Sequence, residues 1–387
     1  MHTRDIVIVG AGMGGLTAAL ALKQRGHQVR VIERTRRLRP AGAAISVWSN
    51  GVRVLDRLGV GEAVRRAGGH MTHMAYKSAD DRALTEFSLA PLYEAVGRAA
   101  CPIARTELQR ILLEAVGEEN VSLGRAGIDY RPTKEGVEVI LDSGERLTAD
   151  LLVVADGVHS SLRERVLGHP VARCYRGYVN WNVRVPATPD LAPLTHWVQY
   201  VGSGQRVSLM PMGQGDFYCF FDVPRPAGSQ GTPSDYRAEL AHHFADWPLP
   251  VKHLIERFDE TAMARVEIHD IDPLTTLVGP RAALLGDAAH AMAPDLGQGG
   301  CQAMEDAWVL AQSLDDASGD IPQALTAYDA ARVERTGEII RRARERAAMT
   351  HAHDPERTRA WYSELAREDG RHIMGGMQKT LESGPLP

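Results

Sequence analysis

The chain has 387 residues, 44% of them hydrophobic, and this length exceeds what one hydrophobic core usually supports, so we expect two interleaved lobes. A formal net charge of -5 argues against a nucleic-acid-binding protein, because such proteins usually carry a strong basic excess. The four cysteines are widely spaced and no apolar run reaches about 18 residues, which predicts a cytoplasmic protein without disulfides, bound metal or membrane contact.

The first expected element is an apolar strand at residues 6–9, which a glycine-rich turn joins to an Ala- and Leu-rich helix. The turn has the G-x-G-x-x-G pattern: the first glycine makes the turn, the second lets a pyrophosphate approach the backbone, and the third packs helix on strand. A second strand, residues 28–32, ends at Glu33, where a carboxylate accepts hydrogen bonds from a ribose diol. This order predicts a dinucleotide site rather than a plain tight turn. The glycines are Gly10, Gly12, Gly14 and Gly15.

A basic cluster follows Glu33 directly. It suits either a 2′-phosphate or a solvated loop without a ligand, and we favour the solvated loop. Arg34 is kept as a candidate cofactor contact, together with Val47 at the end of an extended segment, residues 42–47. The cluster comprises Arg34, Arg36, Arg37 and Arg39.

Arg105 begins an amphipathic helix that is expected at residues 105–116. A cation at a helix N-terminus opposes the helix dipole, so Arg105 needs another partner. We favour a cofactor phosphate or flavin edge over a surface role. Weakly alternating residues 127–148 then predict a small β-meander.

Two further strands end in polar turns, one at Asp156-Gly157 and one at Gly286-Asp287. Ligands of open α/β sheets bind at the carboxyl ends of strands, so the ends at residues 10, 156 and 286 are predicted to converge on one long cofactor. After the last strand a glycine-rich loop frees backbone N–H groups at the start of a helix, which favours an electron-rich ligand. The loop consists of Gly297, Gln298, Gly299 and Gly300.

Long β-prone runs between residues 171 and 223 predict an antiparallel sheet with one face toward a pocket. Arg206 and Tyr218 begin two of these strands and are candidate pocket residues, with plain rim residues as the alternative. Residues 302–314 and 322–350 are expected to be long helices. A last helix is expected around residues 361–366, before an irregular end rich in Gly and Pro.

We predict an α/β protein in which a Rossmann-like domain is interleaved with a β-sheet substrate domain. The first domain comprises residues 1–75, 100–170 and 275–325, the second comprises residues 76–99 and 171–274, and residues 326–387 form a C-terminal helical segment.

The three strand ends and their motifs together resemble the class A flavin monooxygenases of the aromatic-hydroxylase type, over residues 5 to about 345. This resemblance implies FAD as cofactor. It implies that Glu33 holds the adenosine ribose, that Asp287 holds the ribityl chain, and that the 297–300 loop lies at the isoalloxazine edge. It also implies that Asp156 lies near FAD.

Five segments are similar to the branch of this family that hydroxylates urate. Cys301 also stands where most members of the broad family carry Asn, and we interpret it as a packed thiol without chemistry. The segments are GAAISVWSNG (42–51), GYVNWN (177–182), RVSLMP (206–211), EIHDI (267–271) and PDLGQGGC (294–301).

The resemblance implies that NADH or NADPH reduces FAD, that O2 adds at flavin C4a, and that the hydroperoxide hydroxylates urate at C5 to give 5-hydroxyisourate. A planar guanidinium suits a purine anion with several carbonyls, so Arg206 is the expected urate clamp. Tyr218 would donate a phenol hydrogen bond, and Asp295 would accept from a ring N–H or orient a water. No general base is required, so His290 is interpreted as a structural partner.

Two alternatives use the same cofactor elements. A hydroxylase of a phenolic acid such as salicylate or hydroxybenzoate would use Arg206 to clamp a carboxylate. A flavoprotein dehydrogenase would never activate oxygen. The protein is expected to act as a monomer or a homodimer.

Overall fold

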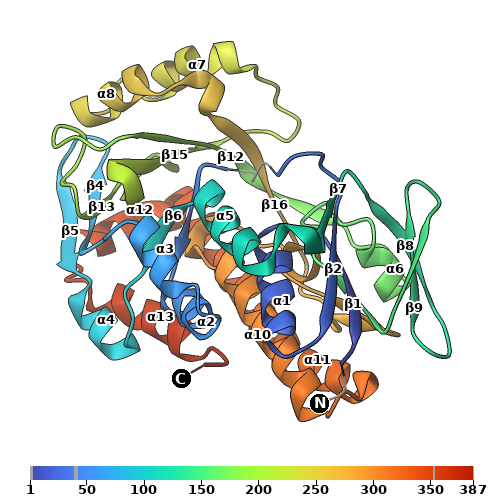
Figure 1. Cartoon of the computed structure of the whole chain (residues 1–387). Coiled ribbons are helices and arrows are strands. Elements are labelled where there is room, and N and C mark those ends of the chain that lie inside the picture. Colours follow the sequence, from blue (N-terminus) through green and yellow to red (C-terminus); the bar gives the residue numbers. More distant parts are fainter. Residues whose placement is uncertain (1–2, 39–41, 352–353, 387) are drawn as a thin grey trace.

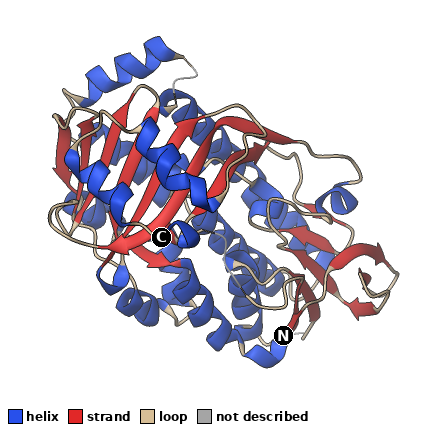
Figure 2. Cartoon of the chain, turned by 90° about the horizontal axis from the view of Figure 1, so that it is seen from above, coloured by secondary structure: helices blue, strands red, loops and turns tan. Residues whose placement is uncertain are grey.

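The computed structural model describes residues 3–38, 42–351 and 354–386. Within this part of the chain the strands form two large sheets, a three-stranded meander and a two-stranded pair (Figure 1). Seen from above, the seven-stranded sheet fills one half of the molecule, and the other half holds further strands and the N-terminus (Figure 2). Arg39 of the predicted basic cluster lies outside the described residues.

The six-stranded sheet carries the predicted Rossmann-like core. Its order is β17-β18-β11-β1-β2-β7, and every pairing is parallel except that of β17 with β18. Strands β1, β11 and β18 are almost entirely buried, which explains their continuous apolar sequences. The strands are β1 (Asp5–Val9), β2 (Gln28–Glu33), β7 (Val121–Leu123), β11 (Leu151–Val154), β17 (Val278–Gly279) and β18 (Ala282–Leu284).

Helices α1 (Met13–Gln24), α5 (Arg105–Val116) and α10 (Gly299–Asp316) accompany this sheet. Helix α1 contacts both α5 and α10, and its Ala- and Leu-rich sequence is buried over most of its length. The expected helix at residues 105–116 and the expected β-meander are both confirmed. The meander consists of β8 (Gly127–Pro132), β9 (Val137–Leu141) and β10 (Arg146–Ala149).

The seven-stranded sheet has the order β16-β12-β15-β14-β13-β4-β5. All of its pairings are antiparallel except that of β13 with β4, so the expected antiparallel sheet is confirmed. Helices α7 (Tyr236–His243) and α8 (Leu249–Arg257) cover one face (Figure 1). The strands are β4 (His73–Ser78), β5 (Ala83–Ser88), β12 (Arg173–Pro186), β13 (His196–Gly202), β14 (Gln205–Pro211), β15 (Asp216–Pro224) and β16 (Ala264–Ile271).

Smaller elements connect the two large sheets. Strands β3 (Ala44–Val47) and β6 (Cys101–Ala104) pair antiparallel. The short helices are α2 (Ser49–Arg57), α3 (Gly61–Ala67), α4 (Ala90–Val96), α6 (Arg163–Leu167) and α9 (Asp287–His290). The proposed domain limits stay a prediction, and β4 begins at His73, inside the first range given to the cofactor domain.

The C-terminal segment is more regular than expected. Helices α11 (Ile321–Thr350) and α12 (Pro355–Leu365) agree with the sequence patterns, but the end predicted to be irregular contains helix α13 (Arg371–Glu382). Two adjacent glycines, Gly375 and Gly376, lower its helix propensity by about 1 kcal/mol each. Helix α13 forms nevertheless because Ile373, Met377 and Leu381 pack into an apolar cluster with α4. No described helix is both long enough and apolar enough to cross a membrane.

Candidate functional site

The glycine-rich turn after β1 is shaped by contacts that exclude side chains. Gly10 has φ +110°, and a Cβ there would lie 2.2 Å from the Ala155 carbonyl oxygen. A Cβ on Gly15 would lie 1.9 Å from the Gly10 carbonyl oxygen, so α1 packs directly on the turn. A Cβ on Gly14 would lie 2.7 Å from Leu285. Gly12 differs, because a Cβ there would have no neighbour within 4 Å, and this open space suits a ligand close to the backbone.

Glu33 lies beside this turn at the end of β2. Its carboxylate accepts hydrogen bonds from Ala11 N at 2.9 Å and from both the backbone and the hydroxyl of Thr35 at 2.9 Å. These bonds fix the carboxylate at the rim of the turn, where the ribose role of Glu33 stays a prediction. The next residue, Arg34, is exposed and makes no ion pair with any described residue, which fits a solvated loop.

The three predicted strand ends do converge. Gly12, Gly157 and Asp287 all line one cavity of about 340 Å³, which we call the strand-end cavity. Arg163 links two of the ends. Its guanidinium donates to the carbonyl oxygens of Ala288 at 2.6 Å and Asp287 at 2.9 Å, after β18. It also donates to the carbonyl oxygen of Val158 at 3.2 Å, after β11. Strands β1, β11 and β18 are neighbours in the sheet, so their carboxyl ends meet at one edge.

Asp156 is not among the residues that line the strand-end cavity, although its neighbours Ala155 and Gly157 are. Its Oδ2 accepts a hydrogen bond from Ser161 N at 3.2 Å, whereas its buried Oδ1 has no partner among the described residues. Burial raises the pKa of this carboxyl group. A buried polar oxygen without a partner is costly, so a ligand group or water beside Asp156 would stabilise the site.

The glycine loop closes the strand-end cavity on another side. Gly297, Gly299 and Gly300 line the cavity. Gly297 has φ +63°, and a Cβ there would lie 2.8 Å from Nε1 of Trp48. Gln298 also belongs to the loop, but its side chain is buried and points away from the cavity: its Oε1 accepts from Asn50 at 2.9 Å. Only the backbone of Gln298 is therefore available to a cofactor.

Val47 and Arg105 approach the strand-end cavity differently. Val47 is fully buried in β3 and does not line the cavity, although its neighbours Ile45 and Ser46 do. A cofactor contact of Val47 would have to use its backbone. Arg105 does line the cavity, and its Nε donates to the Ala44 carbonyl oxygen at 3.1 Å. Its remaining guanidinium nitrogens make no hydrogen bond with a described residue, which leaves them available to a ligand.

Arg206 lies on the side of the strand-end cavity formed by the seven-stranded sheet. It is only 5% exposed, and Asp222, its partner across β14 and β15, is fully buried. Arg206 Nε and Nη2 both lie 2.7 Å from Asp222 Oδ2, and Nη2 donates to Asp295 Oδ1 at 3.2 Å. Nη1 makes no hydrogen bond with a described residue. The two carboxylates therefore fix the guanidinium and leave one edge of its fork free.

Asp295 is held by three side chains. Tyr178 donates its hydroxyl to Oδ2 at 2.6 Å, and Arg206 and His351 contact Oδ1 at 3.2 and 3.3 Å. Burial alone would raise the pKa of Asp295, but the charges of Arg206 and His351 outweigh it and hold the pKa below its usual range. Asp295 is therefore a buried carboxylate held jointly by Tyr178, Arg206 and His351.

Tyr218 faces the strand-end cavity from β15. Its hydroxyl makes no hydrogen bond with a described residue, so it is free to bind a ligand. Burial raises its pKa to about 12. Tyr218 is therefore a neutral phenol at physiological pH and can donate one hydrogen bond.

His290 and Cys301 have the structural environments that the sequence suggested. His290 is fully buried, with Nε2 2.6 Å from Asp306 Oδ2. Cys301 accepts a hydrogen bond from Trp48 N at 3.3 Å, and burial raises the pKa of its thiol to about 12. Neither side chain lines the strand-end cavity.

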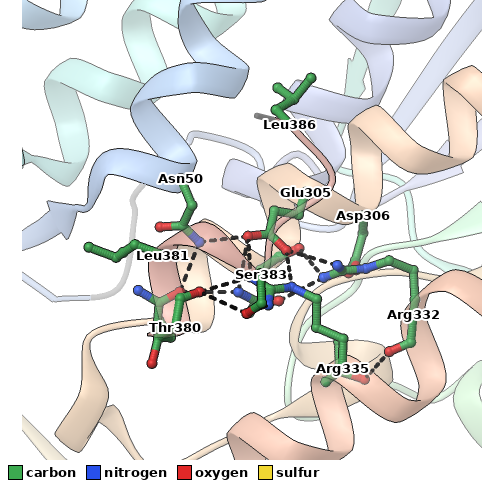
Figure 3. Close-up of polar contacts among 12 residues, drawn as sticks. Asn50, Glu305, Asp306, Arg332, Arg335, Thr380, Leu381, Ser383 and Leu386 are labelled. Carbon is green, nitrogen blue, oxygen red and sulfur yellow. Dashed lines mark hydrogen bonds and ion pairs between the residues drawn. The ribbon is translucent and has the colours of Figure 1, made fainter. Parts of the chain in front are cut away.

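A buried ionic cluster lies behind the glycine loop and ties it to the C-terminus (Figure 3). Arg332 donates to Asp306 at 2.6 Å and to Glu305 at 2.8 Å. Asp306 also accepts from Gly286 N at 2.9 Å, directly at the third strand end. Arg335 donates to Glu305 at 2.6 Å and to the Thr380 carbonyl oxygen in α13 at 3.2 Å. The cluster thus connects the cavity edge to the last helix.

Several residues of the site were missed by the sequence analysis. Asp222 is the main partner of Arg206, yet in the sequence it is one acid in a β-prone run. Tyr178 and Asn180 fall in the segment GYVNWN, which was noted only as a likeness. His351 comes from the far end of α11, and no local pattern places it next to Asp295.

Comparison with known proteins decides the family. Residues 3–343 match the family described as FAD binding domain. The chain belongs to this family. It is 46% identical over 381 residues to a FAD-dependent urate hydroxylase of Klebsiella pneumoniae, an alignment that covers 98% of this chain and 99% of that protein. A FAD-dependent urate hydroxylase of Mycolicibacterium vanbaalenii is 45% identical, over 98% of this chain and 97% of its own length.

Solved structures agree with this membership of the FAD-binding family. The crystal structure of Klebsiella pneumoniae HpxO complexed with FAD and uric acid matches with a TM-score of 0.96 and 45% identity. The match covers 99% of this chain and 98% of that chain. The predicted fold class and the predicted FAD cofactor are therefore confirmed.

The geometry of the strand-end cavity fits FAD. Gly12 leaves open space at the start of α1, where a pyrophosphate binds favourably because of the free N–H groups and the helix dipole. Arg105 also lines this cavity with free donors, and the unpaired oxygen of Asp156 belongs to the residue between two lining residues, Ala155 and Gly157. The residues that would hold FAD are therefore those predicted at the three strand ends, with Gln298 and Val47 restricted to backbone contacts.

Proposed function

We propose that this protein is a monooxygenase that uses FAD, NADH or NADPH, and O2 to hydroxylate urate at C5 and form 5-hydroxyisourate. The observation that carries the proposal is the orientation of Arg206, whose free Nη1 edge belongs to a guanidinium buried in the wall of the strand-end cavity. When bound, FAD supplies the reduction and activation of O2. The protein must therefore bind the substrate, orient it and exclude water.

Arg206 would bind urate by its free edge. Urate is a planar anion with carbonyl oxygens, and the guanidinium offers planar donors that never lose their charge. Asp222 and Asp295 occupy the other edge, so Arg206 cannot rotate to a second orientation without breaking buried ion pairs. The ring position relative to the cofactor is thereby fixed, which is the main contribution that a positioning residue makes to rate.

Asp295 and Tyr218 would have different tasks. The Asp295 side chain is fully buried and already contacts Arg206, Tyr178 and His351, so we assign it to holding Arg206 rather than to a ring N–H. The free hydroxyl of Tyr218 would donate to a urate oxygen or nitrogen, since its raised pKa keeps the phenol protonated. Apolar residues of the same wall, among them Phe220 and Met210, exclude water.

A carboxylic-acid substrate fits this arrangement less well. A carboxylate binds an arginine best through two parallel hydrogen bonds, and the Nε/Nη2 edge of Arg206 is already occupied by Asp222. Salicylate or hydroxybenzoate would therefore meet only the remaining edge, beside two buried carboxylates. This favours the urate reaction over hydroxylation of a phenolic acid.

The direct test mixes the FAD-loaded enzyme with NADH and urate and follows the loss of urate absorbance together with O2 uptake. Equimolar loss of urate, O2 and NADH is expected. NADH oxidation that leaves urate unchanged would refute the proposal and favour a non-oxygenating or uncoupled flavoprotein. Salicylate in place of urate is the parallel reaction, and hydroxylated salicylate as the better product would favour the phenolic-acid alternative.

The clamp is tested with Arg206→Gln, matched with Arg257→Gln on the exposed surface of α8. Loss of a charged hydrogen bond is worth about 1.5–3 kcal/mol, so kcat/KM for urate should fall by about 10- to 100-fold. FAD content and circular dichroism of both variants should match the wild type. Unchanged urate kinetics in Arg206→Gln would remove Arg206 from the site.

The reaction draws on NAD(P)H, so we place the protein in the cytoplasm.

A further inference from the structure

A second cavity of about 330 Å³ lies under the C-terminal helices. We call it the C-terminal cavity. It shares Trp197, Arg206 and Asp295 with the strand-end cavity, so the two spaces adjoin at the residues proposed to hold the substrate. Its other walls come from β4 and β13 and from helices α11, α12 and α13.

Aromatic and thioether side chains line the C-terminal cavity together with charged residues, among them Arg342, Arg346, Glu364 and Glu368. Such walls favour flat rings, because aromatic faces stack on other π systems and methionine adapts its shape to them. Trp48 and Trp197 lie 6.0 Å apart between ring centres, and Arg346 lies 4.3 Å from the centre of the Trp361 ring. The aromatic and methionine residues are Trp48, Met74, Tyr76, Trp197, Met349, Trp361 and Met377.

Two buried N–H donors in this lining have no partner. Trp48 is 3% exposed and Gln199 is 1% exposed. Trp48 Nε1 and Gln199 Nε2 make no hydrogen bond with any described residue. A buried polar group without a partner costs about 1–3 kcal/mol, so a ligand whose hydrogen-bond acceptors reached these two nitrogens would stabilise the site.

We propose that the C-terminal cavity is a second binding site for a planar heterocycle with carbonyl oxygens, and that urate occupies it before passing Arg206 into the strand-end cavity. The inference rests on the proposed function. A cavity of this size falls within the range that binds small molecules. Trp48 and Gln199 would donate to carbonyl oxygens while the aromatic walls contact the ring faces. Arg206 lines both cavities and would lie at the passage between them.

Helix α13 covers one side of the C-terminal cavity. Arg342 holds it by donating to the Gly376 carbonyl oxygen at 3.0 Å, and Arg335 holds it through Thr380. Arg335 belongs to the buried ionic cluster that also reaches the strand end at Gly286 (Figure 3). The same cluster thus supports both cavities.

The experiment counts urate molecules bound per chain. Equilibrium dialysis of the FAD-loaded, oxidised enzyme against urate, without NADH, should give two sites in the wild type. Gln199→Leu removes one donor at nearly constant volume, and Trp48→Phe removes the other donor together with part of the ring. Each variant should leave one tight site. Trp308→Phe, on α10 outside both cavities, is the matched control and should keep two. FAD content and circular dichroism verify that each variant is folded.

Three results would overturn the inference. The first is a single urate site in the wild type, and the second is two sites with unchanged affinity in both Gln199→Leu and Trp48→Phe. The third is that nicotinamide mononucleotide displaces one urate while the site that depends on Arg206 stays filled. That result would assign the C-terminal cavity to the nicotinamide ring. Urate turnover in the wild type separates this failure from that of the proposed function. If the enzyme consumes urate but binds only one urate molecule per chain, the second site is refuted and the proposed function stands.

Discussion

Arg332 should contribute strongly to stability, because it is the central cation of the buried ionic cluster (Figure 3). The informative change is Arg332→Met, which keeps much of the side-chain volume and removes the charge. Arg332 is 1% exposed and donates to Asp306 at 2.6 Å and to Glu305 at 2.8 Å. Its removal leaves two buried carboxylates with fewer partners.

The expected loss can be worked out from the partners that remain. Removing one member of a buried ion pair usually costs about 3–5 kcal/mol. Glu305 keeps Arg335, and Asp306 keeps His290 and Gly286 N, so the loss should be near the lower limit, about 3 kcal/mol. Folded proteins are stable by only about 5–15 kcal/mol, so this is a large share of the total.

Urea unfolding at a fixed excess of FAD measures this loss, because ligand binding itself shifts apparent stability. Arg341→Met is the matched control. Arg341 lies on the same helix, is exposed and makes no ion pair with any described residue, so its replacement should change stability by less than about 0.5 kcal/mol. Equal stability of Arg332→Met and Arg341→Met would refute the reasoning that the cluster depends on Arg332.

Three further predictions follow from buried groups. Asp222→Asn should lower kcat/KM for urate by about 10-fold with FAD content unchanged, since Asp222 touches Arg206 and lines neither cavity. Steady-state kinetics measure the change, and a variant with lower FAD content but unchanged kcat/KM would contradict this role. The positive charges of His290 and Arg332 outweigh burial and lower the pKa of Asp306 to about 2, so unfolding free energy should fall as pH drops from about 4 to 2, and less so in Asp306→Asn. Iodoacetamide should label Cys174 in the native protein, with mass spectrometry finding the three buried cysteines unmodified until urea is added.

Local patterns were sufficient for the cofactor half of the site. The turn from Gly10 to Gly15 and the strand that ends at Glu33 are contiguous in sequence, and their geometry depends on neighbours within one βαβ unit. The polar ends of buried strands likewise follow from continuous apolar runs, which are typical of the strands of a parallel sheet. These features predicted the strand-end cavity before any contact was known.

The substrate half depended on tertiary structure. Arg206 and Asp222 face each other because β14 and β15 pair in one register, and a shift by one residue would point them to opposite faces. His351 reaches Asp295 only because α11 is long enough to return to the seven-stranded sheet.

The sequence by itself determined that the cofactor is a dinucleotide, because glycine turns, strand ends and helix starts are set by residues close together in the chain. The choice of Arg206 as the clamp came from the resemblance to the flavin monooxygenases. Only the tertiary structure decided which edge of Arg206 is free, that Gln298 turns away from the cofactor, and that α13 forms despite two glycines. Those outcomes come from packing and ion pairing between different elements, with partners from 16 residues apart, as for Arg206 and Asp222, to 248 residues apart, as for Asn50 and Gln298, and no local pattern records them.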